Sequence, residues 1–162
     1  MGARGSTVTR KVVLFFAALL LALTAGRAFW VELGENPFNV SGPAYVEFFQ
    51  QVDKRIAGPI AVTGLGGTLL AGLAAFLSRA NRAAFWLLLL GCSLAVIGDV
   101  VTVVVNVPIN NRLATWNPAA LPADYQDYLQ RWWQWHHVRL VATCAAMCLV
   151  FAAMLTAEDR RR

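Results

Sequence analysis

Four long apolar segments constrain the fold of this chain more than any other feature of its sequence. They cover residues 12–31, 58–77, 83–106 and 136–156. A helix of about 20 apolar residues spans the ~30 Å hydrocarbon core of a bilayer. Because lipid offers no hydrogen bonds to the backbone, each segment must satisfy its own polar groups as a helix. The sequence therefore predicts an all-α fold, a bundle of four transmembrane helices that makes residues 1–162 a single integral membrane domain.

Composition and charge agree with a membrane protein. Apolar residues make up 58% of the chain and charged residues 14%, whereas soluble domains average roughly 45–50% and about 25%. The net charge is +5, but the basic residues lie at the ends of apolar segments, so no nucleic-acid partner is expected. All three cysteines, Cys92, Cys144 and Cys148, lie inside apolar segments and are interpreted as small buried hydrophobes.

Basic residues also predict the orientation of the chain. Segments 1–11, 79–82 and 158–162 hold eight of the fourteen Lys and Arg residues. Under the positive-inside rule, this pattern places both termini in the cytoplasm of a multi-pass protein of the plasma (inner) membrane. The first apolar segment could also be a secretory signal, because Thr24, Ala25 and Gly26 would suit cleavage. The apolar run resumes after Arg27, which favours an uncleaved helix.

The first outer loop, residues 32–57, is predicted to contain a short amphipathic helix. Apolar residues recur there at helical spacing, with polar residues on the opposite face. The apolar set is Tyr45, Phe48, Phe49, Val52 and Ile56, and the polar set is Glu47, Gln51, Asp53 and Lys54. The fourth helix is expected to have an extended start near Pro122. Small residues between positions 64 and 72 predict close packing of the second helix against a neighbour.

Asp99 is a carboxylate inside an apolar segment, where an ionisable group is costly and faces the bundle interior. It shares a helix face with Thr102, Asn106 and Asn110 if the helix continues. A cation on a neighbouring helix, Arg27 or Arg139, could neutralise it. Two interpretations remain open: an ion pair that sets helix register, or a buried site whose charges tune a neighbouring group.

The segment Asn106-Val107-Pro108-Ile109-Asn110 interrupts the third helix. Pro108 cannot donate a backbone hydrogen bond, so the helix should end or kink there. The freed carbonyls could be satisfied by the two asparagine amides, and a kink would turn Asn110 over the mouth of the bundle. Simple capping of a helix end is the alternative interpretation.

The start of the fourth helix carries Trp132, His136 and Arg139 on one face. If that face turns inward, a neutral imidazole at His136 could accept a proton. The tryptophans could stack on a ligand or form an aromatic belt at the membrane interface. Two histidines alone make a poor metal site, and Asp99 is the only obvious further ligand for a metal or haem. No metal site and no cofactor are therefore expected.

At these residues the chain resembles the anthrone oxygenase-like family of small four-helix membrane proteins. The matching motifs are Asn-x-Pro-x-Asn at 106–110 and Trp-His-x-x-Arg at 135–139, with a looser match around Gln50 and Gln51. The resemblance covers roughly residues 20–155 and implies the four-helix fold. It further implies oxidation of the activated methylene of an anthrone to a quinone by O₂, without a cofactor.

A mechanism consistent with this resemblance is taken as a hypothesis. His136 would remove a proton from the activated C–H of a flat, apolar phenolic substrate, with Asp99 orienting His136 or Arg139. The resulting oxyanion would be stabilised by polar groups, and the ring would stack on tryptophans. The expected catalytic residues are His136, Arg139 and Asp99. The expected substrate-binding residues are Asn106, Asn110, Trp132, Trp135 and Arg27.

Two other classes of function fit the same sequence. A non-enzymatic assembly factor or accessory subunit would use the small residues and the amphipathic helix as a partner surface. A quinone-binding protein or small transporter would use the carboxylate inside the membrane, although no inverted repeat is present. The expected partners are the lipid bilayer, a small apolar aromatic substrate, and either a second copy of the chain or another membrane protein.

Overall fold

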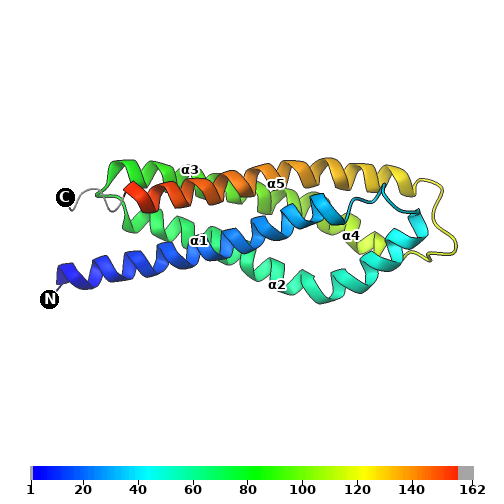
Figure 1. Cartoon of the computed structure of the whole chain (residues 1–162), viewed down its shortest axis with the longest axis horizontal. Coiled ribbons are helices and arrows are strands. Elements are labelled where there is room, and N and C mark those ends of the chain that lie inside the picture. The colour runs from blue at the N-terminus through cyan, green and yellow to red at the C-terminus, as the bar shows by residue number, and fades with distance from the viewer. Residues whose placement is uncertain (1, 157–162) are drawn as a thin grey trace.

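The computed structural model of the protein describes residues 2–156, with the backbone alone for residues 2–6. Its elements are α1 (Gly2–Gly34), α2 (Gly42–Leu77), α3 (Arg82–Val101), the π-helical turn η1 (Thr102–Asn106), α4 (Val107–Leu113) and α5 (Tyr125–Thr156). Because α3, η1 and α4 follow one another without a gap, they form one rod, and the chain builds four long rods (Figure 1). No strand occurs among residues 2–156. The predicted all-α, four-helix architecture is confirmed.

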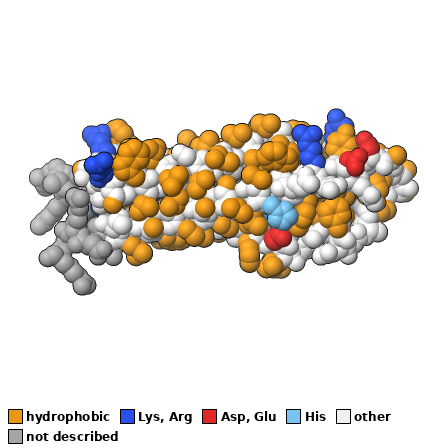
Figure 2. All heavy atoms as spheres, turned by 90° about the horizontal axis from the view of Figure 1, so that it is seen from above, with side chains coloured by type: hydrophobic (Ala, Val, Ile, Leu, Met, Phe, Trp, Pro, Cys, Tyr) orange, Lys and Arg blue, Asp and Glu red, His pale blue; other side chains and the backbone are white. Residues whose placement is uncertain are grey.

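All four rods are long and apolar enough to cross a membrane. The candidate spans are Thr7–Gly34, Gly42–Leu77, Arg82–Leu113 and Tyr125–Thr156. Figure 2 shows hydrophobic side chains along the length of one face, with Lys and Arg side chains towards its two ends. The chain is therefore a multi-pass integral membrane protein. The basic tail at 158–162, which entered the predicted orientation, lies outside the described residues.

Helix α2 joins the predicted amphipathic segment and the second span into one helix that contains Pro59. Proline lacks an N–H and crowds the carbonyl four residues earlier, so it bends a helix. Figure 1 shows α2 bowing away from the other rods near the middle of its length. Residues on both sides of Pro59, namely Ala57, Ile60 and Ala61, line a pocket inside the bundle.

The third rod changes register at η1 instead of ending at Pro108. The N–H of Val107 bonds the carbonyl of Thr102, five residues back, so the backbone is locally wider. The expectation that asparagine amides satisfy freed carbonyls of their own helix is not met. The Asn106 amide donates across the bundle to the Trp132 carbonyl, 3.2 Å away, and the Asn110 amide also bonds to other helices.

Two apolar cores hold the rods together. The terminus-side core packs small and aliphatic residues from all four rods, among them Leu21, Leu88 and Val150. The loop-side core is richer in aromatic residues and includes Tyr45, Phe49, Leu113, Leu129 and Trp132. Near its edge, the Gln50 amide donates to the carbonyls of Leu113 and Trp116, both at 2.9 Å. These bonds tie the end of α4 to α2.

Close packing of α1 on α2 gives a stability prediction. A Cβ on Gly67 would lie 3.1 Å from two side-chain carbons of Leu21 and 3.2 Å from its backbone nitrogen. We expect Gly67→Ala to lower the free energy of unfolding by about 1–3 kcal/mol, because overpacking outweighs the helix propensity of alanine.

The matched control is Gly58→Ala on the same helix, where a Cβ would meet nothing within 4 Å. It should be neutral or stabilising by up to about 1 kcal/mol. Thermal unfolding in mild detergent measures both changes. Equal stability of the two variants would contradict the close approach of α1 and α2.

Candidate functional site

A pocket of about 210 Å³ lies inside the bundle beside the loop-side core, and Val31, Tyr45, Phe49 and Trp132 belong to both. All four rods line it, and its apolar wall includes Val31, Ile60 and Leu65. Ionisable and polar side chains converge on the same space. They are Thr24, Arg27, Glu35, Tyr45, Asp53, Asp99, Thr102, Asn110, Trp132, Arg139 and Thr143. An apolar pocket with a few convergent polar groups is the usual form of a ligand site.

Helix α5 turns Trp132, His136 and Arg139 inward on one face, as their spacing predicts. His136 is fully buried, and its ring lies 5.4 Å from that of Trp132 at an angle of 4°. The ring centre of Trp133 lies 5.3 Å from that of His136, so the three rings form one cluster. The Arg139 guanidinium lies 5.5 Å from the centre of the Trp132 ring. The aromatic rings therefore hold both His136 and Arg139 in place.

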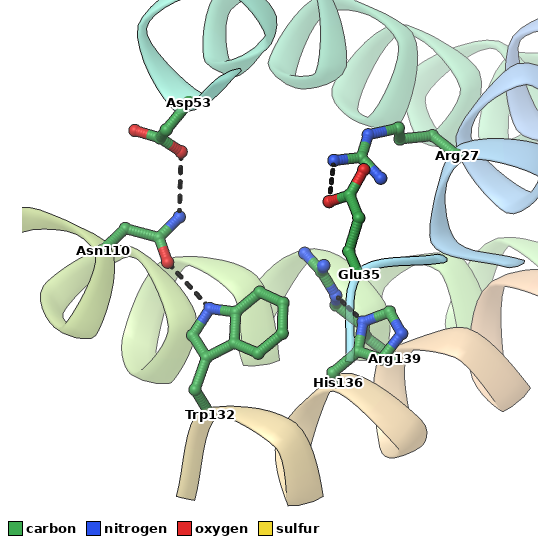
Figure 3. A network of polar contacts seen from close by, with 7 residues as sticks. All are labelled: Arg27, Glu35, Asp53, Asn110, Trp132, His136 and Arg139. Carbon is green, nitrogen blue, oxygen red and sulfur yellow. Dashed lines mark hydrogen bonds and ion pairs between the residues drawn. The ribbon is translucent and has the colours of Figure 1, made fainter. Parts of the chain in front are cut away.

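Arg139 stands between His136 and the pocket. Its Nε donates a hydrogen bond of 3.1 Å to Nδ1 of His136 (Figure 3). Because Nδ1 accepts, the hydrogen of a neutral imidazole is assigned to Nε2. Arg139 lines the pocket and His136 does not. The terminal nitrogens of Arg139 make no hydrogen bond within residues 2–156 that would occupy them, so they are available to a ligand.

Behind His136 lies a second polar cluster that the pocket does not reach. Among the residues that the structure describes, Nε2 of His136 finds no hydrogen-bond partner, and it lies 3.9 Å from Oε2 of Glu32. The same carboxylate oxygen lies 3.1 Å from Nε2 of His137. The His137 side chain is 45% exposed, so this cluster connects the buried imidazole with the protein surface.

Arg27 contributes the second guanidinium of the pocket. One terminal nitrogen, Nη2, lies 2.7 Å from Oε2 of Glu35, so the two side chains form an ion pair (Figure 3). The other, Nη1, is buried and has no hydrogen-bond partner within the described residues. A buried donor without a partner is costly, so Nη1 is a natural contact for an oxygen atom of a ligand.

Asp99 lines the pocket without a cation beside it. Its Oδ2 accepts a hydrogen bond of 2.7 Å from the Thr68 hydroxyl on α2. The expected ion pair with Arg27 or Arg139 is absent from the described part of the chain, where Arg27 pairs with Glu35 and Arg139 bonds His136. A Cβ on Gly64 would lie only 3.2 Å from Oδ1 of Asp99, so the missing side chain makes room for the carboxylate.

Asn110 connects three rods at the edge of the pocket. Its oxygen accepts from Nε1 of Trp132 at 2.7 Å, and its amide nitrogen donates to Oδ1 of Asp53 at 3.3 Å (Figure 3). Both ends of the amide are therefore already engaged by protein groups. Two other residues named from the sequence do not line the pocket: Asn106 is buried against Trp132, and Trp135 is 38% exposed.

Sequence reasoning missed three ionisable residues of the pocket: Glu35, Tyr45 and Asp53. Asp53 was assigned to the outer face of an amphipathic helix, yet it reaches Asn110. Tyr45 was correctly assigned to an apolar face, and its burial follows from that. Glu35 lies beyond α1 and returns to Arg27 because the chain reverses there, which no local pattern indicates.

A metal centre finds no support in the part of the chain that the structure describes. No group of three or more His, Cys, Asp or Glu residues there could hold a metal ion. Cys92, Cys144 and Cys148 are free. The first two are half-buried and Cys148 is exposed, so the expectation that all three are buried was wrong.

The fold and the pocket define a class: a four-helix membrane protein with a polar site enclosed between its rods. Comparison with protein families makes this more specific. Residues 47–149 match the family model of anthrone oxygenase, and the chain belongs to this family. The match covers α2 to α5 and with them most of the pocket lining. The chain is thus a membrane oxygenase-like protein. Comparisons with curated proteins and with solved structures gave no match.

Proposed function

We propose that this protein oxidises a flat, apolar phenolic substrate of the anthrone type with O₂, inside the pocket between its rods. The observation that carries the proposal is the pairing of apolar walls with two guanidinium groups that have nitrogens to spare, those of Arg139 and Arg27. Such a site favours a ring system that becomes negatively charged on one oxygen during the reaction.

The two arginines act on that oxygen. When the activated methylene loses a proton, its electrons spread to the ring carbonyl and form an enolate. Arg139 presents a planar set of N–H donors beside the Trp132 ring, and Arg27 contributes Nη1 from α1, the rod that packs beside α5. Trp132 forms the wall on which the substrate ring packs. The donors are in place before the reaction begins, so their hydrogen bonds to the oxygen strengthen as the negative charge develops on it.

Asp99 is the proton acceptor that this geometry favours. It lines the pocket, no cation within the described residues holds it, and only Thr68 bonds it. His136 has its Nδ1 occupied by Arg139 and no surface in the pocket, so in this scheme it positions Arg139. Relative to the sequence-based hypothesis, Asp99 and His136 exchange roles.

The chemistry balances without a further reductant. Removal of one proton leaves an electron pair on the methylene carbon, which reduces O₂ and forms a C–O bond to a hydroperoxide. Loss of the second C–H proton then breaks the O–O bond, leaves a carbonyl and releases water. One methylene and one O₂ thus give one carbonyl and one H₂O. The substrate supplies all the electrons, so no cofactor is written into the proposal.

The test is turnover by purified protein in lipid nanodiscs, with a hydroxyanthrone as substrate. We expect oxygen uptake and formation of the quinone, both well above the spontaneous rate with empty nanodiscs. With ¹⁸O₂, one labelled oxygen should appear in each quinone, and dialysis against a chelator should not reduce the rate. A rate equal to that of empty nanodiscs would overturn the proposal, and tight quinone binding without turnover would indicate a quinone-binding protein.

The role of His136 gives a separate prediction. His136→Phe keeps an aromatic ring beside Trp132 and Trp133 but removes the acceptor for Nε of Arg139. We expect kcat to fall about tenfold, because one hydrogen bond to a charged group is worth about 1.5 kcal/mol. His136→Gln keeps an acceptor oxygen and should recover part of the loss. Complete inactivity of both variants would instead assign proton transfer to His136.

The proposed location is the plasma (inner) membrane, with both termini in the cytoplasm. The basic residues near the N-terminus and in the turn at 79–82 support this orientation. The start of α1 and the end of α5 lie at the same end of the bundle, as an even number of spans requires (Figure 1). Labelling of cysteines introduced at Asn39 and Arg82, with a reagent that cannot cross membranes, would distinguish the two faces.

A further inference from the structure

We propose that the pocket opens sideways into the lipid, between α2 and the η1–α4 part of the third rod, and that the substrate takes this route. This inference rests on the proposed function, because it concerns the same pocket. It adds the path by which an apolar phenol dissolved in the bilayer reaches the arginines, and the residues that control that path.

Exposure of the lining residues identifies the opening. Those on α1 and α5 are buried or half-buried, including Ala28, Val31, Trp132 and Thr143. The exposed lining residues all lie on α2 or on η1 and α4. They are Phe48, Ala57, Ala61, Leu65, Val103 and Val107, which we call the rim. The pocket therefore reaches the surface on one side of the bundle.

Two backbone irregularities lie beside the rim. Pro59 is between Ala57 and Ala61 on α2, where the helix bows away from the other rods (Figure 1). On the facing rod, the π-helical turn η1 contains Val103. A bend in one helix and a widened turn in the other keep the two rods from packing closely at this level.

The chemistry of the rim suits a solute that arrives from lipid. All six side chains are apolar and uncharged, and the faces that carry them are parts of membrane-length helices. The charged groups of the pocket, among them Arg139 and Asp99, are only half-exposed and come from deeper in the bundle. A flat ring system, neutral or with its charge spread over the rings, can cross such a rim, whereas a small, strongly hydrated ion cannot.

A pair of neighbouring valines provides a matched test. Val103 and Val104 lie on the same turn and are 60% and 66% exposed, but only Val103 lines the pocket. We expect Val103→Trp to slow the association of a hydroxyanthraquinone, supplied in phosphatidylcholine nanodiscs, by about tenfold, while Val104→Trp leaves it unchanged. Dissociation should slow in parallel, so Kd should stay within about twofold.

Helix α2 offers an independent pair with the same logic. Ala61 belongs to the rim, whereas Val62 is exposed and does not line the pocket. Ala61→Trp should slow association and Val62→Trp should not. Stopped-flow quenching of tryptophan fluorescence by the hydroxyanthraquinone measures the association rate of each variant. Because the variants gain a tryptophan, each signal is normalised to its own total amplitude.

The binding probe separates failure of this inference from failure of the proposed reaction. If the wild type binds the probe but does not oxidise a hydroxyanthrone, the reaction is wrong, and the two tryptophan pairs still test the opening. Unchanged association in both rim variants, or equal slowing in the controls, would overturn the lateral route even if oxidation is observed. No binding by the wild type would overturn both.

Discussion

Arg139→Met is expected to lower kcat for hydroxyanthrone oxidation by about 10²–10³-fold, the usual cost of removing one donor to a developing oxyanion. Methionine keeps an unbranched stem beside Trp132, so the aromatic packing should survive. The change removes the guanidinium that lines the pocket and bonds His136. Because this guanidinium acts most strongly on the enolate, KM should change much less than kcat.

Two further variants show whether a lower kcat comes from the lost charge, the lost guanidinium geometry or nonspecific destabilisation of the protein. Arg139→Lys keeps the positive charge but loses the planar guanidinium and Nε. Its kcat should therefore lie between those of the wild type and Arg139→Met. Arg112→Met removes the same functional group outside the pocket, where the arginine packs on Tyr128. It should leave kcat unchanged. Wild-type turnover by Arg139→Met would remove the oxyanion role and the main support of the proposed reaction.

The helices and one face of the site could be predicted because their signals are local. Hydropathy over about 20 residues decides whether a segment spans lipid, and this gave four rods. The spacing of Trp132, His136 and Arg139 decides that they share a face, and the burial of His136 follows once that face turns inward. Each inference needs only residues close together in the chain.

The partners across the pocket could not be predicted, because they depend on how far each helix is rotated and shifted. Nothing near Asp99 indicates that its hydrogen bond comes from Thr68, a neutral residue one rod away. Arg27 and Arg139 were the partners that the sequence suggested for this carboxylate, but in the structure it accepts a hydrogen bond from a hydroxyl group. Likewise, Pro108 signals a disturbed helix, but the sequence does not show that the disturbance is a π-turn.

This unexpected environment of Asp99 leads to the second large effect. Asp99→Asn keeps the shape of the side chain and an oxygen that can accept from Thr68, but it cannot take up a proton. We expect kcat to fall by about 10²–10⁴-fold, the usual contribution of a positioned general base. The affinity for a hydroxyanthraquinone should change little, because that ligand has no proton to give up at the methylene position.

The dependence of the rate on pH distinguishes a base from a structural role for Asp99. As the pH rises, more hydroxyanthrone ionises in solution and arrives without needing a base, so the rate of Asp99→Asn should climb towards that of the wild type. Arg139→Met should show no such recovery, because an ionised substrate still needs the guanidinium. Thr68→Val, which removes only the donor to Asp99, should keep most of the wild-type rate. Full activity of Asp99→Asn together with an inactive His136→Gln would move the base from α3 to α5.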